Sequence, residues 1–369
     1  MKKQLLAAGC ILFSVISPLK AMAADLSSFS QLFVFGDSLS DTGNTFTFTG
    51  GQIPAPTVSG SDRLAYFPGR FSNGSNWVDY FGSQIGKQGL TPIPLVPLLV
   101  NPNPRIASQQ GVNFALGGAQ TGKSSDFPGL QNNIPGVLGQ VGLFSSFNQT
   151  FPADPNALYT IFGGGNDYFS GQTDVNQVVQ NLSNSISSLA QGNAKNFLVF
   201  NQPDLGESPF GRALGFPQQL NELTKEHNKL LALSLDNLRT IRPDINIFSV
   251  DTNALFKTVE FDPVKFGFKD ATNSCITGNF QQVLSICDNP DDFVFFDNVH
   301  LSSRANRLLA DAALASVRGQ SIPEPSAALG ILALGALGLG VLKRKQKKSE
   351  LIPAGRAVAL QSSHTGVES

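Results

Sequence analysis

The segment LFVFGDSLSDTGN, residues 32–44, limits the fold of this chain more than any other stretch of the sequence. Its first four residues are apolar and favour β-structure, which is typical of a buried strand. Gly36 permits a sharp turn after them, so Ser38 is expected at the carboxyl end of a strand, where a helix begins. In open α/β sheets, ligands bind at this edge. A serine there either caps the helix or acts as a nucleophile whose own N–H can hold an anion.

Strands and helices alternate along the rest of the chain up to residue 317. Short apolar runs predict further buried strands at 111–115, 156–162, 195–200, 244–250 and 293–296. Apolar residues at helical spacing predict helices over 77–85, 175–189, 220–238 and 305–312. This alternation predicts an α/β fold with a parallel sheet between helices. The sequence has no evident second core or internal repeat, so residues 25–317 are expected to form one domain.

The N-terminus has the pattern of a secretory signal peptide. The letters MKK supply a charged start, residues 5–19 an apolar centre, and AMA (residues 21–23) the small residues that precede cleavage. Residues 1–24 are therefore expected to direct export and to be removed.

The C-terminus differs in composition from the domain. A polar, proline-containing linker covers residues 318–325, an unbroken apolar run covers 326–342, and a tail with a basic start covers 343–369. The apolar run would be about 26 Å long as a helix, close to the ~30 Å of a hydrocarbon core. We expect a membrane span with the basic tail in the cytoplasm and the domain outside. The alternative is a core helix buried on all sides.

Two cysteines remain after export, Cys275 and Cys287. Cysteines in an exported chain with a short loop between them are typical of a disulfide. The alternative is a pair of free thiols.

Charge and ligand patterns argue against several classes of function. A net charge of −1 argues against general nucleic-acid binding. The histidines are isolated, and the cysteines lack a second ligand pair at zinc spacing. The sequence has no phosphate-binding loop of the P-loop kind. We therefore expect no metal and no cofactor.

A serine nucleophile needs a base, and the chain has three histidines. His364 lies beyond the expected membrane span. His227 stands at an apolar position of a predicted helix, which favours a packed, hydrogen-bonded role. His300 follows a short apolar strand and has Asp297 three residues before it. A carboxylate at that spacing can orient the imidazole across a turn. Many surface turns contain the same pattern, so the prediction rests on elimination.

Donors for an oxyanion are available at other predicted strand ends. Gly118 can present a backbone N–H, Asn166 a side-chain amide, and Ser38 its own N–H. Taken alone, the glycine-containing segments 117–118 and 164–167 are typical of turns.

Four blocks of the sequence resemble the GDSL, or SGNH-hydrolase, family of lipases and esterases. They are GDSLSDTGN (36–44), NFALGGA (113–119), GGND (164–167) and DNVH (297–300), and they occur in the family's order. The resemblance implies a flavodoxin-like three-layer sandwich with a mainly parallel five-stranded sheet. It also implies Ser38 as nucleophile, His300 as base and Asp297 as its partner, with Ser38, Gly118 and Asn166 lining the oxyanion hole. Both Gly117 and Gly118 match the second block.

The C-terminus resembles the bacterial PEP-CTERM sorting signal. PEP at residues 323–325, the apolar run and the basic cluster carry this resemblance, whereas residues 349–369 continue past the point where such signals usually stop. It implies a sorting protease as partner and a location at the cell surface, in the periplasm or in the extracellular matrix. A simple membrane anchor over residues 326–342 is the alternative.

The sequence thus predicts an exported serine esterase or lipase that works through an acyl-enzyme on Ser38. A carbohydrate acetyl esterase acting on surface polysaccharide is the first alternative, and a non-catalytic surface protein on a hydrolase fold is the second. The Phe-rich and Pro-rich loops over residues 46–71 and 90–104 either form an apolar acyl pocket or pack as ordinary surface.

Overall fold

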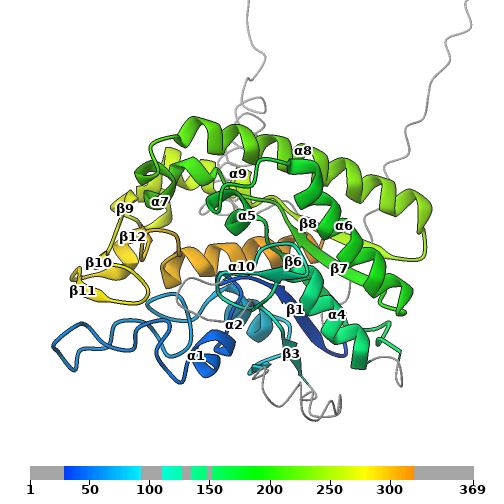
Figure 1. Ribbon diagram of the computed structural model, residues 1–369, viewed down its shortest axis with the longest axis horizontal. Coiled ribbons are helices and arrows are strands. Elements are labelled where there is room, and N and C mark those ends of the chain that lie inside the picture. The colour runs from blue at the N-terminus through cyan, green and yellow to red at the C-terminus, as the bar shows by residue number, and fades with distance from the viewer. Residues whose placement is uncertain (1–28, 93–109, 127–133, 148–151, 320–369) are drawn as a thin grey trace, which may run out of the picture. The chain divides into compact units, whose positions relative to one another are not determined.

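The computed structural model describes residues 29–92, 110–126, 134–147 and 152–319 (Figure 1). The expected signal peptide over 1–24, the membrane span over 326–342 and the tail over 343–369 lie outside these residues. Across the part of the chain that is described, no helix is long and apolar enough to cross a membrane.

The centre of the fold is a parallel sheet. Its five main strands lie in the order β3-β1-β6-β7-β8, and the two-residue strand β2 pairs with β3 at the edge. The bounds are β1 (Leu32–Gly36), β2 (Thr91–Pro92), β3 (Gly111–Asn113), β6 (Leu158–Phe162), β7 (Asn196–Phe200) and β8 (Asn246–Val250). Numbered along the chain, the main strands have the order 2-1-3-4-5, which is that of flavodoxin-like folds. The predicted fold class is confirmed.

Side chains of each strand alternate between two helical layers. Phe33 and Phe35 of β1 pack in one apolar cluster with helices α4 (Val137–Phe147), α6 (Val175–Gln191) and α8 (Pro217–Ile241). Leu32 and Val34 pack on the opposite face with α2 (Trp77–Gln84), α9 (Thr252–Phe261) and α10 (Ser303–Val317). Because both faces are covered, the strands read as continuous apolar runs in the sequence.

The remaining elements are short. The helices are α1 (Asn44–Phe48), α5 (Gly165–Phe169), α7 (Pro209–Ala213) and the 3₁₀ turns η3 (Leu205–Glu207), η4 (Pro263–Phe266) and η5 (Pro290–Asp292). The strands are β4 (Ser124–Ser125), β5 (Ile134–Pro135), β9 (Asp270–Ser274), β10 (Ile276–Gly278), β11 (Val283–Ile286) and β12 (Phe293–Phe295). The apolar run at 293–296 contributes β12, which pairs with β9 and not with the central sheet.

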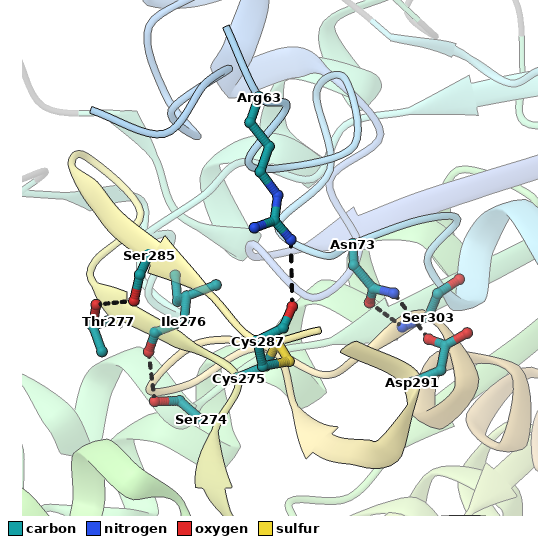
Figure 2. Close-up of a disulfide and its surroundings, with 10 residues drawn as sticks. All are labelled: Arg63, Asn73, Ser274, Cys275, Ile276, Thr277, Ser285, Cys287, Asp291 and Ser303. Carbon is teal, nitrogen blue, oxygen red and sulfur yellow. Dashed lines mark hydrogen bonds between the residues drawn. A yellow bond between two sulfur atoms is a disulfide. The ribbon is translucent and has the colours of Figure 1, made fainter. Parts of the chain in front are cut away.

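Cys275 and Cys287 are joined by a disulfide at the base of the β10–β11 hairpin, with their Cα atoms 5.1 Å apart (Figure 2). Figure 2 also shows the guanidinium of Arg63 donating a hydrogen bond to the carbonyl oxygen of Cys287, at 3.4 Å. A second link joins Ala55 N–H to the carbonyl oxygen of Phe280 in the hairpin. The long loop after α1 is thereby attached to a hairpin that is distant in the sequence.

Candidate active site

The turn after β1 requires glycine at position 36. A Cβ on Gly36 would lie 2.5 Å from the carbonyl oxygen of Phe162 on the neighbouring strand, so no larger residue fits. The buried side chain of Gln140 accepts from the N–H of Gly36 and donates to its carbonyl oxygen, both at 2.9 Å. Gln140 thus satisfies both backbone groups of Gly36 and fixes the point at which the chain turns towards Ser38.

Asp41 holds the segment after Ser38 in place. Its carboxylate accepts hydrogen bonds from the N–H groups of Gly43, Asn44 and Thr45, and from the hydroxyl of Thr45. It also accepts from the N–H of Gly117. Burial raises the pKa of Asp41, and these hydrogen bonds oppose the increase. The carboxylate therefore ties the first sequence block to the second.

Two asparagines complete the link between these blocks. Asn44 donates through Nδ2 to the carbonyl oxygens of Asn113 and Ala115, both at 2.8 Å. Asn113 donates through its own Nδ2 to the carbonyl oxygen of Ser40 and to the hydroxyl of Thr42. The polar residues of both blocks are buried connectors between the ends of β1 and β3.

Ser38, His300 and Asp297 form a continuous chain of short hydrogen bonds. Ser38 Oγ lies 2.7 Å from His300 Nε2, and His300 Nδ1 lies 2.6 Å from Asp297 Oδ2. The other oxygen of Asp297 accepts from the N–H groups of Val299 and His300. Ser38, His300 and Asp297 are 8%, 4% and 2% exposed. The structure therefore brings together the three side chains that the sequence singled out.

The carboxyl group of Asp297 is held in its charged form. Burial alone raises its pKa, but the charge of His300 and hydrogen bonds from His300 and Tyr66 outweigh that effect. The net result is a pKa below the ordinary value for aspartate. A carboxylate that stays ionised can stabilise a protonated imidazole beside it.

Tyr66 is a site residue that sequence reasoning missed. Its hydroxyl donates to Asp297 Oδ2 at 2.5 Å, and its ring packs edge-on against Phe296. Burial, followed by the charge of Asp297, raises the pKa of Tyr66, so the phenol remains a donor. Tyr66 lies in a proline- and glycine-rich loop without periodicity, and no pattern in the sequence connects it to Asp297.

The structure distinguishes between the two glycines of the second block. The N–H of Gly117 donates to the carboxylate of Asp41 and to the hydroxyl of Thr45. The N–H groups of Gly118 and Ser38 have no hydrogen-bond partner among the described residues. Asn166 uses one amide hydrogen to donate to the carbonyl oxygen of Ala119 at 3.0 Å, which leaves its second amide hydrogen available. Gly118 is thus the glycine with a free donor.

Two aromatic rings lie beside the imidazole of His300. The ring centroid of Phe71 is 4.8 Å away and that of Phe280 is 6.3 Å away. Phe71 belongs to the Phe-rich loop after α1, and Phe280 lies between the strands of the disulfide-linked hairpin. Part of that loop therefore borders the site.

A cavity opens on the other side of Ser38. Its lining comes from the turn after β1, from α5, from the segment after β7, from α9 and from the region of β12 and α10. Asp37 and Asn166 lie in its wall together with Ser38. Burial raises the pKa of Asp37 to about 7.

His227 lies away from this chain of hydrogen bonds. It is fully buried on α8, and its Nδ1 lies 2.8 Å from the hydroxyl of Tyr168. Its Nε2 has no hydrogen-bond partner among the described residues. Burial lowers the pKa of His227 to about 4. His227 is therefore a packed histidine with one hydrogen-bonded ring nitrogen.

The residues that the structure describes contain no cluster of three or more histidine, cysteine or carboxylate side chains placed to hold a metal ion.

Comparison with known protein families gives two matches. The model for GDSL-like lipase/acylhydrolase matches residues 32–313, and the model for the PEP-CTERM protein-sorting motif matches residues 321–345. The second match overlaps the run that was expected to span a membrane.

Individual proteins also resemble this chain. Phosphatidylcholine-sterol acyltransferase of Aeromonas hydrophila is 30% identical over 274 residues, which are 71% of this chain and 70% of that protein. A GDSL esterase/lipase of Arabidopsis thaliana is 29% identical, covering 78% and 85% of the two chains. Among solved structures, the carbohydrate acetylesterase Est24 of Sinorhizobium meliloti is 17% identical with a TM-score of 0.41, covering 78% and 98% of the two chains.

Proposed function

The chain belongs to the GDSL-like lipase/acylhydrolase family and is a carboxylic ester hydrolase with a C-terminal PEP-CTERM sorting motif, and from this premise we propose that it cleaves esters through an acyl-enzyme on Ser38. The observation that carries the proposal is the hydrogen-bond chain from Ser38 through His300 to Asp297, with links of 2.7 and 2.6 Å. A hydroxyl bonded to an imidazole that is itself oriented by a carboxylate is the arrangement that activates a serine.

In the first step, Ser38 Oγ forms a bond to the carbonyl carbon of the ester while His300 Nε2 takes its proton. The electron pair of the carbonyl moves onto oxygen. When the tetrahedral intermediate collapses, the alcohol oxygen leaves with the proton from His300. Water then attacks the acyl-enzyme with His300 again as base, which releases the acid and restores the Ser38 hydroxyl.

The negative oxygen of each intermediate needs nearby donors. We propose the N–H groups of Ser38 and Gly118 and the side-chain amide of Asn166. The free N–H of Gly118 supports this choice, because that of Gly117 is already bound to Asp41 and Thr45. One such donor is typically worth ~10²–10³ in rate.

The PEP-CTERM motif indicates export and sorting to the cell surface. This location favours surface polysaccharide as a second candidate substrate, so a carbohydrate acetyl esterase is the alternative to an acyl-lipid hydrolase. The intact hydrogen-bond chain supports an enzyme over a non-catalytic surface protein.

A hydrolysis panel on the full chain tests the proposal. Esters of increasing acyl length, phospholipids and acetylated sugars are compared for wild type, for Ser38→Ala and for the exposed control Ser59→Ala. We expect turnover by wild type and the control and none by Ser38→Ala. Release of acetate from sugars alone would favour the carbohydrate esterase, and full turnover by Ser38→Ala would refute the role of Ser38.

We also propose that residues 1–24 are removed during export and that residues 326–342 hold the protein in the membrane until a sorting protease processes the tail. N-terminal sequencing and alkaline extraction of membranes test these steps. A chain lacking residues 326–342 should appear in the soluble exported fraction. Equal membrane association with and without these residues would contradict the anchor.

A further inference from the structure

The cavity beside Ser38 runs along one face of α9. Thr252, Phe256 and Glu260 all line it, and their spacing of four residues places them in one stripe along the helix. At ~1.5 Å per residue the stripe is about 12 Å long. Ser38 lines the same cavity. A group bound along α9 would therefore lie close to the proposed nucleophile.

The walls of this cavity are mainly aromatic and aliphatic. They include the rings of Phe162, Phe169, Phe256 and Phe295. The faces of aromatic rings carry partial negative charge and attract cations. The cavity offers about 50 Å³, which is room for a group of about four heavy atoms. A substituted ammonium group is of that size.

Two polar groups in this apolar wall have no partner of their own. The hydroxyl of Thr252 has no hydrogen-bond partner, although the residue is only 1% exposed. The carboxylate of half-buried Glu260 makes no hydrogen bond or ion pair with any residue that the structure describes. A buried hydroxyl such as that of Thr252 is normally satisfied, and leaving it unsatisfied is costly, whereas the half-buried carboxylate of Glu260 is a charge without a cation beside it. Both groups line the same cavity, so a ligand there can supply the missing partner.

The surroundings of Glu260 leave a local excess of negative charge. Burial, followed by the charges of Glu207 and Asp204, raises the pKa of Glu260 to about 7. Lys257 and Arg212 oppose this increase. However, Lys257 is paired with Asp204 at 3.1 Å and Arg212 with Glu207 at 4.0 Å. Glu260 is the carboxylate of this group without a cation of its own, so a cationic ligand is complementary to it.

We propose that this cavity binds the ammonium group of a cationic ester substrate, with Glu260 as counter-ion and the aromatic walls around the cation, while the ester carbonyl lies at Ser38. The proposal rests on the proposed ester hydrolysis and defines a substrate class for it. The hydroxyl of Thr252 can accept a hydrogen bond from a water that hydrates the cation.

A pair of isosteric esters tests the site. Butyrylcholine and 3,3-dimethylbutyl butyrate have the same shape, but carbon replaces the charged nitrogen in the second. For wild type above pH 7 we expect kcat/KM to favour butyrylcholine by roughly tenfold. Glu260→Gln should bring the two values together, whereas Glu222→Gln, an exposed glutamate on α8, should keep the wild-type ratio. Equal values in wild type would overturn the proposal.

The preference should also depend on pH. Glu260 gains a proton as the pH falls below about 7. The ratio of kcat/KM for butyrylcholine to kcat/KM for 3,3-dimethylbutyl butyrate should therefore decline from pH 8 to pH 6. In Glu260→Gln the decline should be clearly smaller, and what remains is the contribution of Asp37, which lines the same cavity and has a pKa raised to about 7. A ratio in wild type that does not change with pH would contradict the role of Glu260 as counter-ion.

A binding measurement separates this proposal from the proposed function. Choline chloride is titrated calorimetrically into Ser38→Ala and into the double variant with Glu260→Gln. Binding of choline to Ser38→Ala but not to the double variant supports the cation site. If this is seen in a protein that turns over no ester, only the proposed ester hydrolysis is refuted. If neutral esters are turned over but choline does not bind and charge gives no preference, the cation site is refuted and the proposed ester hydrolysis stands.

Discussion

Asp297 is the residue on which the hydrogen bonds of the site converge. Oδ2 accepts from the imidazole of His300 and from the phenol of Tyr66, and Oδ1 accepts from two backbone N–H groups. The sequence predicted the contact with His300, because the two residues are three apart and other histidines could be set aside. It could not predict Tyr66, whose hydroxyl arrives from a loop 231 residues away.

Tyr66→Phe should alter the pH profile more than the fold. Loss of the phenol hydroxyl removes a donor from Asp297 and strengthens the attraction between this carboxylate and the protonated imidazole. The base then gives up its proton less readily, so the acid side of the kcat/KM profile should shift to higher pH by about half a unit. Tyr159→Phe, which removes a phenol hydroxyl that donates to the carbonyl oxygen of Asp154, is the control and should leave the acid side of the profile unchanged. If the acid side of the kcat/KM profile does not shift in Tyr66→Phe, the phenol has only a structural role.

Asn166→Ala tests the proposed oxyanion donor. The amide would act on charge that develops only in the transition state, so its loss should lower kcat by ~10²-fold while KM changes little. Asn184→Ala on the exposed face of α6 is the control. A rise in KM at constant kcat would assign Asn166 to substrate binding instead.

At the scale of elements, the site depends on connections between strand ends. Asp41, Asn44 and Asn113 join the segment after β1 to the segment after β3 through buried hydrogen bonds. The sequence predicted both strands and the order of the blocks from apolar runs. It assigned no role to these polar residues, since a periodic pattern contains no information on partners that are 69 to 76 residues away.

Gln140→Leu should destabilise the end of β1. Its amide satisfies the N–H and the carbonyl oxygen of Gly36 in a fully buried position. Leucine would leave the buried N–H of Gly36 without a partner, whereas the carbonyl oxygen would keep the hydrogen bond from the N–H of Leu116, so the free energy of unfolding should fall by about 2 kcal/mol. Urea unfolding measures this change, with the exposed Gln180→Leu on α6 as control. Equal unfolding midpoints for the two variants would contradict the role of Gln140.

At the scale of the molecule, the sheet order brings the site together. In the order 2-1-3-4-5 the direction of winding reverses at β1, and ligands bind outside the carboxyl ends of the strands at such a point. The sequence predicted the alternation of strands and helices, and the family resemblance supplied the sheet. The strand at 293–296 was predicted, but its pairing with β9 outside the main sheet was not. The β10–β11 hairpin was not predicted, because such short strands have weak patterns.

The buried His227 should make the stability of the whole molecule depend on pH. Its pKa is about 4 in the folded chain and about 6.5 when exposed. Between these values the unfolded chain binds more protons, so the free energy of unfolding should fall as the pH falls from 7 to 4, by about 3 kcal/mol from this residue. His227→Gln should flatten that part of the profile. Asp37 titrates in both proteins, so the difference between their profiles isolates His227. Parallel profiles would contradict the assignment.

The central claim is that Ser38 becomes acylated during ester hydrolysis. The most direct measurement is to treat the full chain with a fluorophosphonate and to locate the adduct by tandem mass spectrometry. The proposed mechanism predicts one phosphonyl group on Ser38, loss of ester turnover in proportion to labelling, and no adduct in Ser38→Ala. An unmodified Ser38 in a fully inhibited protein, with the adduct on another residue, would contradict it.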